Sequence, residues 1–230
     1  MKIKLLLPII FLLLVKISVG QTQDTLNIIP IDGSPPIPIE VFAGDKGVTF
    51  QLIVSKQFSQ KSRFGFFNVT TFSGDYEEVS QVSVFYSQSV LTAKIWKGIS
   101  IIGGLSTVGS SSPGIMTVRP TSGLQYLFAN RDFVVVILPR FDLTQTYNFE
   151  TFAVFEYTPM LSKNWGIYSR IQALYNYNTK LDFHEVSSIY VRLGVSYKNF
   201  QFGLGSNHDF YGADNYNVNN FGLFIKTNLF

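Results

Sequence analysis

The sequence predicts an all-β protein, an antiparallel transmembrane β-barrel of about 12 strands, and three observations support this. Apolar and polar residues alternate repeatedly, the alternating runs are long, and the chain begins with a leader typical of exported proteins. An alternation of period two places one dry and one wet face on each strand. A tilted strand needs about 9 to 11 residues to cross a bilayer, whereas strands of soluble proteins average about 5 or 6.

Residues 1–20 have the layout of a secretory signal peptide. Lys2 and Lys4 precede an apolar run from Leu5 to Val15, and the small residues Ser18 and Gly20 precede Gln21. The run is too short for a spanning helix, which needs about 20 residues. We expect the mature chain to begin near Gln21, residues 21–35 to form a periplasmic lead or a plug, and residues 36–230 to form the barrel.

The composition excludes several function classes. Charged residues make up 14% of the chain, below the roughly 25% of ordinary soluble domains. Of the 18 basic residues, Lys2, Lys4 and Lys16 lie in the leader, so the remaining positive charges balance the 15 acidic side chains. Bulk charge therefore gives no support for nucleic-acid binding. The absence of cysteine excludes disulfides, cysteine-ligated zinc and a lipid anchor on cysteine.

The strands follow from the alternation. Val48, Phe50 and Leu52 alternate with the polar residues Thr49 and Gln51, and similar alternation recurs to the end of the chain. The even-numbered connections are expected to be short and periplasmic, and the odd-numbered ones longer and extracellular, the longest covering residues 108–120. The predicted strands cover residues 37–44, 47–57, 63–73, 79–90, 94–107, 121–129, 132–141, 147–157, 165–177, 187–197, 200–209 and 219–230.

Aromatic residues cluster where the predicted strands begin and end, as in the girdles of membrane barrels. One expected girdle contains Tyr157, Trp165, Tyr197, Phe200 and Phe230, and the opposite one contains Tyr147, Tyr175, Tyr177 and Tyr211.

The mature chain resembles outer-membrane β-barrel proteins of the Bacteroidota type. The resemblance is carried by the segments Phe42-Ala43-Gly44-Asp45-Lys46, Arg63-Phe64-Gly65-Phe66-Phe67-Asn68, Tyr157-Thr158-Pro159, Asn199-Phe200-Gln201-Phe202-Gly203 and the last strand ending in Phe230. It implies a location in the outer membrane of a Gram-negative bacterium and assembly by the barrel-insertion machinery, for which Phe230 would be the signal. Lys226 and Asn228 depart from the pattern, because they share the parity of Phe230.

Charged residues on the wet face are the candidate functional residues: Glu150, Glu156, Arg170 and Arg192. Charges at membrane depth must point into the barrel. A turn centred near residue 161 would place Glu150 opposite Gln172 and Arg170 opposite Phe152, so that the whole cluster shares one height. The cluster then either lines an anion-attracting pore or forms the ion-paired interior of a filled barrel. The filled form is favoured because several large side chains also point inward by parity.

Catalytic chemistry has weak support. His184 and His208 are the two histidines, both expected near the long loops, and Ser206 and Asp209 lie close to His208 in sequence. We interpret these as solvated loop residues, and a metal site combining both histidines with Asp209 and Asp214 would require the loops to converge. No catalytic residue, cofactor or metal is predicted.

The sequence therefore predicts a narrow, porin-like outer-membrane channel for small polar solutes, in contact with membrane lipid and the insertion machinery. A non-conducting structural or accessory barrel and a hydrolase at the rim are the alternatives.

Overall fold

The computed structural model describes residues 37–76, 83–110, 114–212, 214 and 216–229, which form a closed antiparallel barrel. Each strand pairs with its sequence neighbours, and β1 pairs with β12 to close the barrel. The strands are β1 (Ile37–Gly44), β2 (Gly47–Gln57), β3 (Phe64–Asp75), β4 (Ser83–Trp96), β5 (Ile99–Ser110), β6 (Ile115–Ala129), β7 (Phe133–Asp142), β8 (Phe149–Tyr157), β9 (Trp165–Asn178), β10 (Phe183–Tyr197), β11 (Phe200–Tyr211) and β12 (Tyr216–Leu229).

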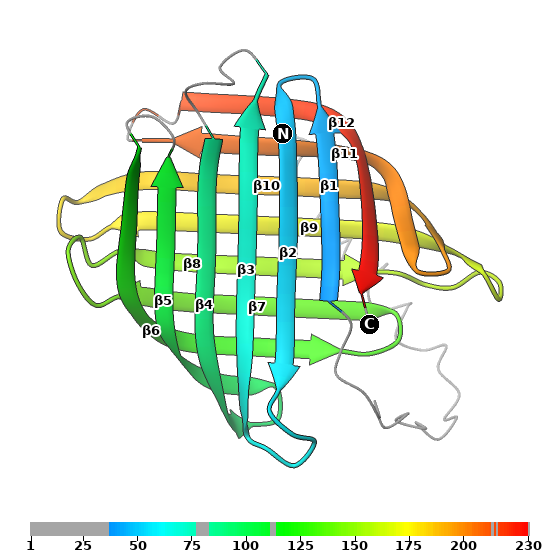
Figure 1. Ribbon diagram of the computed structural model, residues 1–230, viewed down its shortest axis with the longest axis horizontal. Helices are drawn as coiled ribbons and strands as arrows, with labels where there is room; N and C mark the ends of the chain where they lie inside the picture. The colour runs from blue at the N-terminus through cyan, green and yellow to red at the C-terminus, as the bar shows by residue number, and fades with distance from the viewer. Residues whose placement is uncertain (1–36, 77–82, 111–113, 213, 215, 230) are drawn as a thin grey trace, which may run out of the picture. The chain divides into compact units, whose positions relative to one another are not determined.

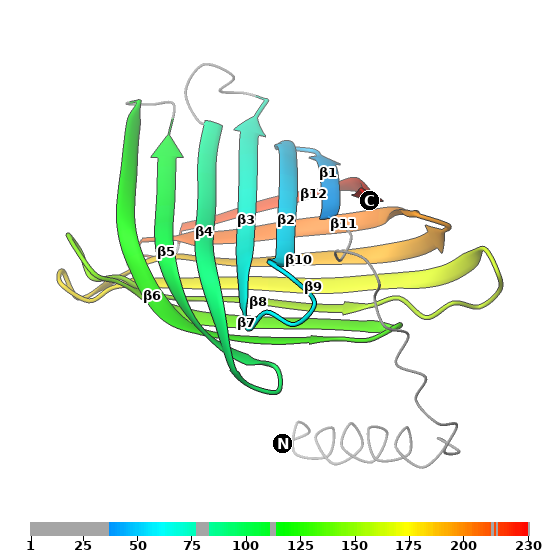
Figure 2. The same ribbon diagram turned by 60° about the horizontal axis from the view of Figure 1, so that its bottom comes forward.

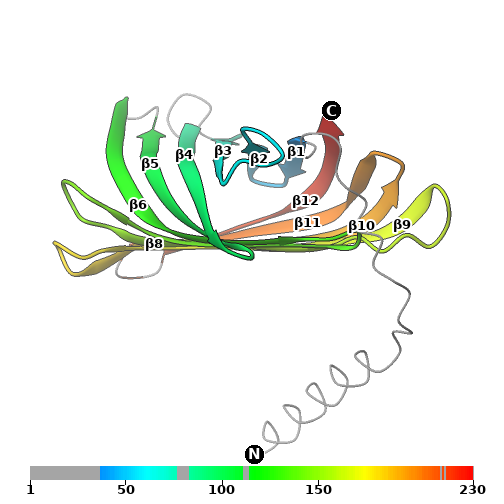
Figure 3. The ribbon, with the colours of Figure 1, turned by 90° about the horizontal axis from the view of Figure 1, so that it is seen from below.

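The 12-stranded antiparallel barrel confirms the predicted fold class. Strands β1 to β5 run steeply across those of the opposite wall, as expected when every strand tilts strongly against the barrel axis (Figures 1 and 2). Figure 3 shows the wall of β8 to β11 almost flat, with β2 and β3 facing it. Opposite walls of a flattened barrel lie close enough for their inward side chains to meet.

Two connections between strands differ most from the prediction. The connection expected at residues 91–93 is wrong, because β4 continues to Trp96 and the turn is Lys97-Gly98. Lys97 adopts a φ of 38°, a left-handed conformation suited to a two-residue hairpin. The long loop expected at residues 108–120 is also wrong, since β5 continues to Ser110 and β6 begins at Ile115. The connections at the two ends of the barrel therefore differ less in length than expected.

Outward-facing side chains are mainly large and apolar. On β9, Ile167 and Ile171 are about half exposed, whereas Tyr168 and Arg170 between them are buried. The same alternation places Leu193, Leu204, Leu223 and Ile225 on the outer surface of the following strands. An apolar outer belt around a polar interior is the arrangement of a protein that crosses a membrane with strands. The chain is thus an outer-membrane type β-barrel.

One polar group interrupts the outer belt on β3 and β4. The Asn68 side chain donates to Ser87 Oγ at 3.2 Å and to Ser89 Oγ at 2.9 Å, and Thr70 donates to Asn68 Oδ1 at 3.0 Å. Because these groups form hydrogen bonds with one another, they can face the membrane without leaving polar atoms unpaired.

Both aromatic girdles are present on the outer surface. At one end Trp165 lies 4.6 Å from Tyr197, and Phe133 stacks on Tyr157 at 4.5 Å, both between ring centroids. Tyr175 is exposed at the other end. The expectation that Tyr211 belongs to the outer girdle is wrong, because Tyr211 lines a cavity of the barrel interior.

The barrel interior contains an apolar cluster. Its side chains come from the strands on either side of β6. Phe67, Val69, Val90 and Ile102 come from β3 to β5, and Val136, Leu138, Phe152 and Val154 come from β7 and β8. At the corner, a Cβ on Gly123 would lie 2.2 Å from the carbonyl oxygen of Pro139, so the close approach of β6 and β7 requires glycine. All eight side chains are at most 5% exposed, so this cluster leaves no open passage where it lies.

The signal peptide at residues 1–20, the lead at 21–35 and the terminal Phe230 lie outside the described residues and remain predictions. No helix in the described part of the chain is long and apolar enough to cross a membrane.

Candidate functional site

Arg170 and Arg192 meet a carboxylate that the sequence analysis missed. They are directly paired across β9 and β10, and both contact Oε1 of Glu40 on β1, Arg170 through Nη2 at 2.8 Å and Arg192 through Nε at 3.0 Å. All three side chains are at most 4% exposed. Arg192 also lies over the Phe42 ring at 4.3 Å from its centroid and donates to Asn207 Oδ1 at 2.8 Å. This group holds β1, β9 and β10 together inside the barrel.

Glu156 and Lys226 form the second ion pair of this level. Lys226 Nζ lies 2.6 Å from Glu156 Oε2, and the Tyr168 hydroxyl donates to the same oxygen at 3.0 Å. Glu156 stands directly opposite Arg170 in the β8–β9 register. Lys226 lies in the inward-facing row of β12 together with Phe224, and there it neutralises Glu156. We call Glu40, Glu156, Arg170, Arg192 and Lys226 the charged layer.

Glu150 belongs to a different cluster. It forms an ion pair with Arg140, whose Nη2 lies 2.7 Å from its Oε1 and whose Nε donates to the same oxygen at 3.1 Å, it accepts from Asn176 Nδ2 at 2.7 Å, and the Tyr86 hydroxyl also donates to it. Arg140 further contacts Asp142. Every member lies toward the end of the barrel formed by the odd-numbered connections.

The expected register between β8 and β9 is wrong. Glu150 pairs with Asn176 and Phe152 with Leu174, because the pairing of the two strands is centred on residue 163, two positions later than expected, although the midpoint of the connection at residues 158–164 is 161. Along β9, Arg170 and Asn176 are six residues apart, which is roughly 20 Å at about 3.3 Å per residue. The four predicted residues are thus all inside the barrel but occupy two heights, and no ion pair joins Glu150 to either of the two arginines in the described residues.

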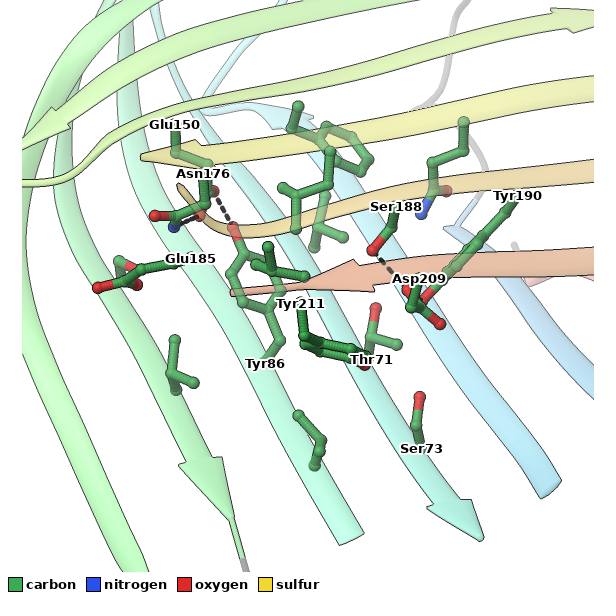
Figure 4. Close-up of a pocket in the computed structure, with 18 of the residues that line it drawn as sticks. Thr71, Ser73, Tyr86, Glu150, Asn176, Glu185, Ser188, Tyr190, Asp209 and Tyr211 are labelled. Atoms are coloured by element: carbon green, nitrogen blue, oxygen red, sulfur yellow. Dashed lines mark hydrogen bonds between the residues drawn. The ribbon is translucent and has the colours of Figure 1, made fainter. Parts of the chain in front are cut away.

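A cavity of about 370 Å³ enters the barrel from the odd-numbered end (Figure 4). Its wall carries the carboxylates Glu150, Glu185 and Asp209 and the rings of Tyr86, Tyr190 and Tyr211. Ser188 and Tyr190 donate to Asp209 Oδ1 at 2.5 and 3.1 Å. Asn148 and Asn178 donate to the two oxygens of Glu185 at 2.7 and 2.8 Å. We call this space the acidic cavity.

A smaller cavity of about 90 Å³ opens at the opposite end. Arg63, Lys94 and Lys97 are among its lining residues, so its charge is opposite to that of the acidic cavity. Side chains of the apolar cluster separate the two spaces. On β3, Gly65 lines the small cavity, Phe67 belongs to the cluster and Val69 reaches the acidic cavity. The interior is thus open from both ends and closed in the middle, which agrees with the filled form favoured by the sequence.

The rim residues His208 and Asp209, expected to lie together, face opposite sides of the barrel wall. His208 faces outward, where its ring nitrogens lie 2.6 Å from Asn219 Oδ1 and 3.1 Å from Ser206 Oγ. Asp209 faces the acidic cavity on the other side of the wall. His184 contacts Ser187 Oγ at 2.7 Å and the carbonyl oxygen of Gly212. Within the described residues, no group of three or more acidic or histidine side chains could hold a metal ion.

Sequence reasoning missed Glu40, Arg140, Asp142 and Lys226, all of which are buried. The rule that charges inside a strand must point inward would have found Glu40, Arg140 and Lys226, which lie within predicted strands, whereas Asp142 directly follows the predicted strand 132–141.

No protein-family model matches the chain, and no curated protein matches it. Solved structures with a similar arrangement include outer-membrane porins. The NanC porin has 12% identity and a TM-score of 0.46, with 86% of this chain and 100% of that one covered. The KdgM porin has 15% identity and a TM-score of 0.43, over 83% and 97% of the two chains. The outer membrane protein opdK from Pseudomonas aeruginosa has 8% identity and a TM-score of 0.38, over 77% and 67%. These similarities are distant, with TM-scores below 0.5.

Proposed function

We propose that the protein is a narrow outer-membrane channel for small polar solutes, closed in the present conformation by the apolar cluster and the charged layer. One observation carries the proposal: two cavities, each with charged side chains in its wall, enter the interior from opposite ends of one closed barrel. Among the described residues, side chains of the apolar cluster close the path between the two cavities.

The competing function is a non-conducting structural barrel. The apolar cluster favours it, since eight side chains from two walls close the middle of the interior. Opening a passage through such a cluster exposes apolar surface to water, which costs roughly 25 cal/mol per Å². Wild-type conductance is therefore expected in small and brief steps.

Single-channel recording on refolded protein in planar bilayers separates the two functions. Phe152 is 2% exposed and belongs to the cluster, whereas Phe155 on the same strand is 47% exposed on the outer surface. We expect Phe152→Ala to enlarge the conductance steps, because it removes a ring from the interior, and Phe155→Ala to leave them unchanged. If neither the wild type nor Phe152→Ala passes current, the channel is rejected and the structural barrel stands.

A further inference from the structure

We propose that the acidic cavity binds small organic cations that carry ammonium or guanidinium groups. This names the solute class of the proposed channel and in that sense rests on it. The site itself is built from the charges, acceptors and rings of the cavity wall.

The cavity and the residues that contact its wall carry an excess of negative charge. Arg140 contacts Glu150 and Asp142, and Arg119 lies 3.4 Å from Asp142. Both guanidinium groups are thereby occupied. Glu185 and Asp209 accept only from amide and hydroxyl groups among the contacts of the described residues. Two carboxylates therefore face the cavity without a cation.

A third acceptor points to a ligand that donates hydrogen bonds. Gln172 lines the acidic cavity and is 6% exposed, and its Oε1 accepts no hydrogen bond in the described structure. A buried amide oxygen without a donor costs free energy, about 1–3 kcal/mol by mutational data. A cationic N–H group entering the cavity would satisfy it together with Glu185 or Asp209.

The shape of the cavity favours an organic cation over a metal ion. Figure 4 shows Glu185 and Asp209 well separated, with the Tyr86 and Tyr211 rings between them. A single metal ion needs its ligands gathered at about 2–2.6 Å, which these carboxylates do not provide. A chain with an amine at each end can reach both, and the tyrosine faces attract the cation by cation–π contact. The volume of about 370 Å³ falls within the range of small-molecule sites.

Titration calorimetry on the refolded protein in detergent micelles tests the site, with putrescine as the probe. Glutarate, a dicarboxylate of similar length, and glucose, a neutral polar solute, are the comparison probes. We expect putrescine to bind and the other two not to bind. No binding of putrescine, or equal binding of glutarate, would overturn the proposal.

Three variants locate the cation. Glu185→Gln and Asp209→Asn each remove one charge at nearly constant shape, and each should weaken putrescine binding about tenfold. Gln172→Leu keeps the net charge and should weaken it several-fold through the lost acceptor. Asp214→Asn is the matched control, because Asp214 is exposed at the same end and does not line the cavity.

Unchanged binding in all three cavity variants, or equal weakening by Asp214→Asn, would show diffuse attraction and overturn the site. A heat-modifiable gel shift checks that each variant has folded. Because calorimetry needs no current, binding without conductance would reject the channel and retain the site. Conductance without putrescine binding would retain the channel and reject the site.

Discussion

Arg170 and Arg192 stand directly opposite each other on neighbouring strands and donate to the same carboxylate oxygen. That oxygen belongs to Glu40, which reaches them from the first strand of the barrel. Two like charges at one height are tolerated because a single acidic group lies between them. The contact also joins strands far apart in sequence, so it bears on closure of the barrel as well as on the charge of its interior.

Glu40→Gln should destabilise the barrel strongly. The substitution keeps the shape of the side chain but leaves two buried guanidinium groups without a carboxylate. Removing one partner of a buried ion pair costs about 3–5 kcal/mol. Urea unfolding in micelles, followed by tryptophan fluorescence, measures the change. Asp214→Asn serves as the charge-matched control on the surface and should change the free energy of unfolding by less than about 0.5 kcal/mol.

Arg170→Ala should destabilise the barrel less than Glu40→Gln does, because Arg192 keeps Glu40 paired after Arg170 is removed. Ile171→Val, on the outer face of the same strand, is the control and should have a smaller effect. Equal stability of Arg170→Ala and the wild type would mean that the side chain is solvated, and the buried layer would then be incorrect.

Glu156 and Lys226 should show strong coupling in a double-mutant cycle. Each single alanine variant leaves one buried charge unpaired, whereas the double variant removes both. We expect the double variant to lose less stability than the sum of the two single losses. The difference in the free energy of unfolding should be about 1 kcal/mol or more. Additive losses would contradict a direct ion pair. Thermal melting or urea unfolding of the four proteins gives the coupling energy.

The sequence predicted the strand number and most strand limits because the period of two recurs along almost the whole mature chain. Turns were harder to place. Lys97-Gly98 was missed because the favourable turn conformation at Lys97 depends on backbone geometry that no local composition shows. The isolated bridge between Met160 and Gly166 helps to place the β8–β9 turn, and it too lacks a sequence signal.

The candidate site was only partly predictable for a related reason. Alternation assigns Arg170, Arg192, Glu150 and Glu156 to the interior, but it says nothing about which strand faces which across the barrel. The Glu40 contact joins residues 130 and 152 positions apart in sequence. Such a partner follows from closure of the barrel between β1 and β12 and from the flattening of its walls, which are properties of the whole fold.

A charged side chain placed on the outer face should destabilise the barrel strongly at its middle and only weakly at its edge. Ile171 lies near the centre of β9 and is exposed on the outer surface, whereas Tyr177 lies close to the end of the same strand. Ile171→Arg should lower the free energy of unfolding in lipid vesicles by about 2–4 kcal/mol, and Tyr177→Arg should lower it by about 0–1 kcal/mol. Equal costs at the two positions would contradict a membrane-spanning β9.

Alternate side chains of β9 face lipid and the interior of the barrel, and the membrane-spanning fold depends on this alternation. The chain contains no cysteine, so single cysteines at Ile171 and Gln172 can each carry one bimane label. Quenching by brominated lipid in vesicles reports which label contacts the membrane. We predict strong quenching at position 171 and weak quenching at position 172. The opposite order, or equal quenching at both positions, would contradict the barrel described here.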